Sequence, residues 1–142
     1  MCIVAAVDGA EHAERIAREA AALAAAFDLE LHVVNVLTRS RFVEIEHGSY
    51  EKRGETVPVE RVRNSAQEIA ERSATSLSTP PTCVGLVGDI ATETLEYADE
   101  HDARYVVVGG RRRSPVGKAI FDSVTQDILL RAERPVVTVM RD

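Results

Sequence analysis

Short apolar runs alternate with stretches of helical periodicity along the whole chain. Cys2–Val7 is a run of apolar residues, whereas apolar residues recur at every third or fourth position between Ala13 and Phe27. The first pattern is typical of a buried strand and the second of an amphipathic helix. Further strands are expected at 29–37, 82–87, 103–108 and 135–140, and further helices at 62–77, 90–98 and 124–132.

This alternation predicts parallel strand pairing, because each right-handed crossover returns the chain beside an earlier strand. The predicted fold is a single α/β domain over residues 1–142. It is a three-layer α/β sandwich with a five-stranded parallel sheet in the order 3-2-1-4-5 and helices on both faces. In such sheets ligands bind beyond the carboxyl ends of the strands at the point where the order reverses. Asp8-Gly9 and Gly109-Gly110 should therefore meet at one crevice.

Composition and charge exclude several classes of function. The formal net charge is −6, and the only dense basic cluster is Arg111–Arg113, so no nucleic-acid partner is expected. No apolar run approaches the roughly 20 residues that span a bilayer, so we expect a cytoplasmic protein without a membrane partner. Cys2 and Cys83 lack metal-binding spacing and are expected to be buried reduced thiols, with no metal site.

The segment from Gly109 to Ser123 has the parts of an anion-binding corner. Glycines end an apolar strand, the basic residues Arg111–Arg113 follow, and Asp122-Ser123 opens a helix. Free N–H groups and the positive end of the helix dipole favour phosphate at such a terminus. Each part also has a structural interpretation. Gly109-Gly110 suits a plain turn, the arginines suit a solvated loop, and Ser123-Val-Thr-Gln126 fits a capping box.

Motifs for turnover are missing. The chain has neither a phosphate-loop Gly-x4-Gly-Lys-Ser/Thr nor Gly-x-Ser-x-Gly, and its histidines are scattered. A phosphoacceptor domain would need a lysine at a late strand end, whereas Lys118 falls within the basic loop. No catalytic residue is assigned. Asp8 is either a ligand contact or a turn and cap residue. The long connection Thr38–Thr56 suits a lid or a mobile segment.

The chain resembles the universal stress protein family over nearly its whole length. The resemblance is carried by Val4–Gly9, His32–Val36, Gly88–Ile90 and the stretch from Val106 to Val137, which is similar to the family signature Gly-x2-Gly-x9-Gly-Ser/Thr. It implies a homodimeric α/β protein of stress physiology, some of whose members bind ATP. By position it implies that Asp8 lies near ribose and adenine, that the Val36 backbone meets adenine, and that Gly109 and Ser123 are phosphate-loop positions.

Two positions depart from that signature. Arg112 and Asp122 stand where the family has glycine, which lets phosphate approach the backbone. A carboxylate about 4 Å from a phosphate oxygen costs roughly 1 kcal/mol in water and about 4 in a partly buried site. We therefore expect Asp122 to be the residue that weakens phosphate binding most, unless Arg112 forms an ion pair with it.

The sequence thus predicts a homodimer that binds ATP or AMP weakly or conditionally, with Mg²⁺ as an accompanying ion, as a stress-response sensor or interaction module. The alternatives are a nucleotide-free partner-binding protein and slow ATP hydrolysis or phosphotransfer. The last strand, at a sheet edge, is the expected dimer interface: Val136, Val137, Thr138, Val139 and Met140. The candidate nucleotide-binding residues are Ala6, Val7, Asp8, Val36, Val108, Gly109, Arg111, Arg112, Arg113, Asp122, Ser123 and Val124.

Overall fold

The computed structural model describes residues 1–10, 12–45, 58–112, 119–120 and 122–141. Its helices are α1 (Ala13–Phe27), α2 (Arg39–Ile45), α4 (Val59–Ser73), α5 (Ile90–Glu100) and α6 (Ser123–Arg131). Its strands are β1 (Cys2–Ala6), β2 (Glu30–Leu37), β3 (Thr82–Val87), β4 (Ala103–Arg112), β5 (Ala119–Ile120) and β6 (Val136–Arg141).

The strands form one sheet whose parallel part has the predicted order. β3 pairs with β2, β2 with β1, β1 with β4, and β4 with β6, all in parallel. Since β6 is the last of the expected strands, the order 3-2-1-4-5 and the three-layer α/β fold are confirmed. β5 is an addition that the sequence did not suggest, and it pairs antiparallel with Arg111 and Arg112 of β4.

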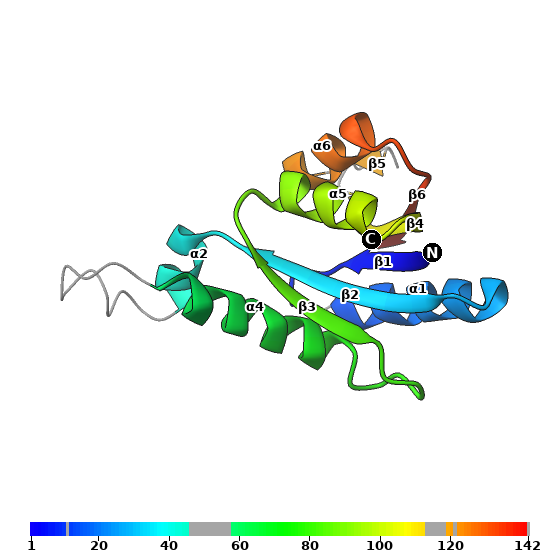
Figure 1. Ribbon diagram of the computed structural model, residues 1–142. Coiled ribbons are helices and arrows are strands. Elements are labelled where there is room, and N and C mark those ends of the chain that lie inside the picture. The colour runs from blue at the N-terminus through cyan, green and yellow to red at the C-terminus, as the bar shows by residue number, and fades with distance from the viewer. Residues whose placement is uncertain (11, 46–57, 113–118, 121, 142) are drawn as a thin grey trace.

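Helices cover both faces of the sheet because its strands are apolar on both sides. Ile3, Ala5 and Val33 face α1 in one buried cluster, whereas Val4 and Val34 face α5 and α6 in another. Figure 1 shows α1 and α4 on one side of the strands and α5 and α6 on the other. A strand with both faces buried reads as a continuous apolar run, which is why Cys2–Val7 is so easily recognised.

The connection after β2 begins with a helix that the sequence analysis did not predict. α2 starts directly after Thr38, whose Oγ1 accepts a hydrogen bond from the Arg41 backbone N–H at 3.0 Å. Phe42 of α2 is fully buried against Leu37 and Val62. Packing therefore holds this short helix in place, since a helix of its length is marginal by itself. Residues 46–56 of the expected lid lie outside the described residues.

The fourth strand is longer than predicted. β4 continues through Gly109 and Gly110 to Arg112, so the glycines do not end the strand and the arginines at 111 and 112 do not belong to a loop. The extension is stable because both its edges are paired: Gly109–Arg111 with Val139–Arg141 of β6, and Arg111–Arg112 with β5. Arg113, Ser114 and Lys118 lie outside the described residues.

Both cysteines are free thiols, as expected. Cys2 is buried as expected, whereas Cys83 is only half-buried, because β3 lies at the edge of the sheet. Burial raises the pKa of both thiols. No helix within the described residues is long and apolar enough to cross a membrane.

A buried polar cluster lies where β1 and β2 begin. The Nδ1 atom of His32 shares a hydrogen bond of 2.6 Å with the Tyr97 hydroxyl of α5. The Tyr97 ring stacks on His101, with 3.9 Å between ring centroids. Burial, and to a smaller extent the neighbouring His101, lowers the pKa of His32 from 6.5, and burial raises the pKa of Tyr97 to about 12. The environment of His32 therefore favours its neutral form.

Close helix–sheet contact depends on Gly85. A Cβ atom at this position of β3 would collide with the carbonyl oxygen of Arg63 and the backbone nitrogen of Gln67, both on α4. Because backbone atoms cannot turn away as a side chain can, only glycine lets α4 lie this close to the strand.

Replacing Gly85 should therefore destabilise the fold strongly. We expect Gly85→Ala to lower the free energy of unfolding by about 3 kcal/mol, the upper end of overpacking costs. Urea unfolding followed by circular dichroism measures this change. Thr82→Ala, at an exposed position of the same strand, is the control and should cost less than about 1 kcal/mol. Equal losses in the two variants would contradict this account of Gly85.

Acid should weaken the fold through His32. The pKa of His32 in the folded protein lies below its unfolded value of 6.5. As the pH falls, the unfolded state therefore binds a proton before the folded state does. The stability that this residue contributes is complete above about pH 6.5 and is lost as the pH falls to the folded pKa. Urea unfolding between about pH 8 and pH 5 should show a steeper loss for the wild type than for His32→Gln. Equal pH dependence of the free energy of unfolding in the two proteins would refute this role of His32. A pKa of His32 at or above 6.5 in an NMR titration would refute it as well.

Candidate functional site

A cavity of about 150 Å³ opens where β1 ends beside β4, at the reversal point of the strand order. The walls come from the end of β1, the start of α1, the middle of β4 and the N-terminal ends of α5 and α6. This is the crevice predicted from the topology. The crevice residues are Ala6, Val7, Asp8, His12, Ile16, Ile90, Val108, Gly109, Asp122, Val124, Thr125 and Ile128.

Asp8 forms the turn that follows β1. Its Oδ1 atom accepts a hydrogen bond of 2.9 Å from the Ala10 backbone N–H, and Gly9 has a φ of +79°, which favours glycine. The structural interpretation of Asp8 is thus confirmed. This hydrogen bond leaves the Asp8 carboxylate with further acceptor capacity, because a carboxylate has about four acceptor positions. Asp8 is exposed and lines the crevice, so its other oxygen can accept from a ligand.

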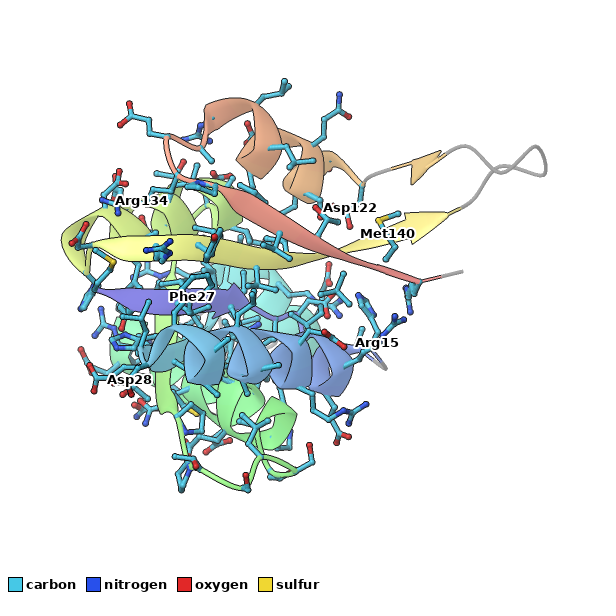
Figure 2. The ribbon with its side chains drawn as sticks, turned by 90° about the vertical axis from the view of Figure 1, so that its right-hand side faces the viewer. Arg15, Phe27, Asp28, Asp122, Arg134 and Met140 are labelled. Carbon is cyan, nitrogen blue, oxygen red and sulfur yellow. The ribbon has the colours of Figure 1, made fainter. Side chains whose placement is uncertain are left out.

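Asp122 caps α6, which corrects the expected capping role of Ser123. The Asp122 Oδ1 atom accepts a hydrogen bond of 2.8 Å from the Thr125 backbone N–H, and Ser123 is the first residue of the helix. Aspartate caps as well as serine does, so the helix begins one residue earlier than a Ser-x-x-Gln box requires. Figure 2 shows Asp122 at the start of α6, at the end of the molecule that also holds Arg15 and Met140.

Gly109 is covered by the start of α1. A Cβ atom there would lie 2.6 Å from Nε2 of His12 and 2.7 Å from Cδ1 of Ile16, so these side chains rest directly on the glycine. On the other side, the hydroxyl of the buried Thr125 donates a hydrogen bond of 2.9 Å to the Gly109 carbonyl. This contact ties α6 to β4 and fixes the wall of the crevice.

Polar contacts connect α5 and α6, whose N-terminal ends line the crevice. Asp89 caps α5, accepting from the Thr92 backbone N–H at 3.0 Å and from its hydroxyl at 2.8 Å. These hydrogen bonds lower the pKa of Asp89. Arg131 of α6 donates to the Thr92 hydroxyl at 3.0 Å. Ile90, at the start of α5, is thereby positioned as a crevice wall.

The structure brings most of the predicted residues together. Ala6, Val7, Asp8, Val108, Gly109, Asp122 and Val124 line the crevice. Ser123 is exposed on the first turn of α6 beside them, whereas Val36 is buried on β2 and is not among the residues of the crevice wall. Only the backbone of Arg111 and Arg112 is described, and it belongs to β4.

Sequence reasoning missed His12, Ile16, Ile90, Thr125 and Ile128. His12 and Ile90 stand at the starts of helices that follow strands, so their place at the carboxyl edge of the sheet could have been inferred from the topology. Ile16, Thr125 and Ile128 read as ordinary positions of an amphipathic helix and gave no such signal. Among the described residues, no group of three or more His, Cys, Asp or Glu side chains could hold a metal ion.

Comparisons with known proteins agree with this geometry. The family model of the universal stress protein family matches residues 1–140. A universal stress protein of Mycolicibacterium smegmatis is 48% identical over 54 residues, which cover 37% of this chain and 42% of that relative.

Solved structures match over almost the entire chain. A universal stress protein from Archaeoglobus fulgidus is 30% identical, with a TM-score of 0.60 and 97% of each chain covered. The structure of the universal stress protein from the same organism in complex with dAMP is 25% identical, with a TM-score of 0.55, and the match covers 97% of this chain and 96% of that one. Since the family model spans nearly every residue and the strand order agrees, this chain belongs to the universal stress protein family.

Proposed function

We propose that this protein is a homodimeric stress-response sensor or interaction module that binds an adenine nucleotide weakly in the crevice between β1 and β4. The observation that supports it most is the meeting of Asp8 and Gly109, about a hundred residues apart in sequence, in one crevice at the strand-order reversal. A related protein has been solved in complex with dAMP.

The crevice provides groups suited to an adenosine moiety. Val7, Val108 and Val124 offer apolar surface for a base, and the carboxylate of Asp8 can accept from ribose hydroxyls. The cavity of about 150 Å³ is smaller than the roughly 300–1,000 Å³ typical of ligand pockets. A complete nucleotide therefore has to extend out of it or widen it, which explains why weak binding is expected.

Binding can be tested directly by NMR. Adenosine, AMP and ATP, with and without Mg²⁺, are titrated into the ¹⁵N-labelled protein while the backbone amide resonances are followed. Saturable shifts should centre on Asp8, Gly109 and Ser123, with dissociation constants in the micromolar to millimolar range. Mass spectrometry of small molecules released from the denatured protein tests whether a nucleotide copurifies.

Three outcomes would change the proposal. Saturable shifts confined to other surfaces would disprove the placement. No saturable shift with any of the three ligands would favour the nucleotide-free partner-binding protein. Phosphate release in a single-turnover experiment with ATP would favour slow hydrolysis.

The proposed dimer interface is the free edge of β6. Within the described residues β6 pairs only with β4, and Val136, Val137 and Met140 are only partly buried. A groove of about 640 Å³ runs between this strand and α1, with Arg15, Glu19 and Leu23 on its helix side. Figure 2 shows Arg15 beside Met140, and Arg15 donates to the Met140 carbonyl at 2.9 Å. An unpaired apolar edge of this kind is a liability in a monomer, and pairing with a two-fold mate covers it.

A charge in this edge should separate the subunits. We expect a dimer in sedimentation velocity at micromolar concentration, and Met140→Lys should weaken association at least tenfold because each subunit would bring a charged side chain into the apolar strand pair. Leu130→Lys is the matched control, since Leu130 is 78% exposed on α6. A monomeric wild type, or equal effects of the two substitutions, would contradict this interface.

A further inference from the structure

We propose that the crevice selects the nucleoside end of its ligand, so that adenosine binds more tightly than AMP and AMP more tightly than ATP. This inference rests on the proposed function and specifies the class of ligand that the same site takes. Three features of the described residues support it: the negative charge of the crevice, the cap that Asp122 provides at the N-terminal end of α6, and the pairing of the backbone around Gly109.

The crevice carries negative charge and no described positive charge. Asp8 and Asp122 contribute two carboxylates, and His12 is the only other titratable residue among those that line it. Carboxylate oxygens accept hydrogen bonds from hydroxyl and amino groups, whereas they repel phosphate oxygens. An uncharged ligand rich in donors, such as adenosine with its ribose hydroxyls and exocyclic amine, complements this lining.

The N-terminal end of α6 is already occupied by a carboxylate. A free helix end attracts anions through its unpaired N–H groups and the dipole. Here the Asp122 Oδ1 atom takes the Thr125 backbone N–H at 2.8 Å. An incoming phosphate would have to displace a charge that is covalently part of the chain, or bind beside it.

The backbone near Gly109 is also committed to other contacts. Gly109 and Gly110 pair with β6, and Arg111 and Arg112 pair with β5. The side chains of His12 and Ile16 cover the position where a Cβ of Gly109 would lie. Gly109–Arg112, the first part of the segment that the family resemblance assigns to phosphate, is therefore a paired strand rather than an open loop. Apolar walls and acceptors remain for the nucleoside.

The test compares affinities by calorimetric titration in Mg²⁺-free buffer at low salt. Adenosine should bind at least about tenfold more tightly than ATP, and AMP should have an intermediate affinity. Each added phosphate brings further negative charge toward the carboxylates. Raising the salt to about 0.5 M should narrow the gap, since exposed charges are then screened.

Asp122→Asn is the informative variant. Asparagine caps a helix about as well as aspartate, so the fold is retained while the charge is removed. ATP should bind several-fold more tightly to Asp122→Asn than to the wild type, and the ratio of ATP affinity to adenosine affinity should rise. Asp122→Gly should also tighten ATP, at a cost in helix stability that denaturant unfolding detects. Glu68→Gln, an exposed position of α4 outside the crevice, makes the same change in net charge and should alter neither affinity.

Several results would overturn this inference and leave nucleotide binding intact. They are ATP binding as tightly as adenosine in wild type, an unchanged ATP-to-adenosine ratio in Asp122→Asn, and an equal effect of Glu68→Gln. Preference for Mg²⁺-ATP over adenosine would also overturn it, because the carboxylates would then serve a cation that carries the phosphates. Binding of none of the three ligands would overturn both this inference and the proposed function.

Discussion

Parallel pairing of β1 with β4 is the contact on which the rest of this structure depends. Val4 pairs with Val106 and Ala5 with Val107, and all four side chains are buried. Each of these residues serves the core of one sheet face, so the pairing is fixed by burial on both sides at once. Because it joins the first strand to one a hundred residues later, it also creates the reversal in strand order that opens the crevice. The core and the candidate site therefore share one cause.

The crevice shows how helix stability and anion binding compete for the same atoms. A helix start needs an acceptor for its free N–H groups, and Asp122 supplies one from within the chain. The same carboxylate removes part of what makes a helix start attractive to phosphate. A glycine at this position would leave the N–H groups to a ligand and give a weaker cap. The residue at position 122 thus sets the balance between a stable α6 and an open phosphate site.

The two ends of the sheet use polar residues differently. At the carboxyl end, Asp8 and Asp122 are exposed and retain acceptor capacity. At the opposite end, His32 and Tyr97 are buried and satisfy each other, with His101 stacked against the tyrosine ring. α5 joins the two ends, since Ile90 at its start lines the crevice and Tyr97 lies in its last turns. Polar groups at one end remain available to a ligand, and those at the other end connect a helix to the sheet.

The sequence by itself determined the order of elements along the chain and the family resemblance, because apolar runs and helical stripes reflect burial that is local to each element. The strand order and the meeting of Asp8 with Gly109 could be predicted only by adding the general rules for parallel α/β sheets. Tertiary structure alone decided that β4 continues to Arg112, since that extension exists only because β5 and β6 pair with it. It decided likewise that Asp122 rather than Ser123 caps α6, and that His12 and Ile16 cover Gly109. The strand extension and the cover over Gly109 join segments far apart in the chain and leave no local pattern, so they could be known only from the folded molecule. Asp122 and Ser123 are adjacent residues that cap helices about equally well, so the sequence could not choose between them.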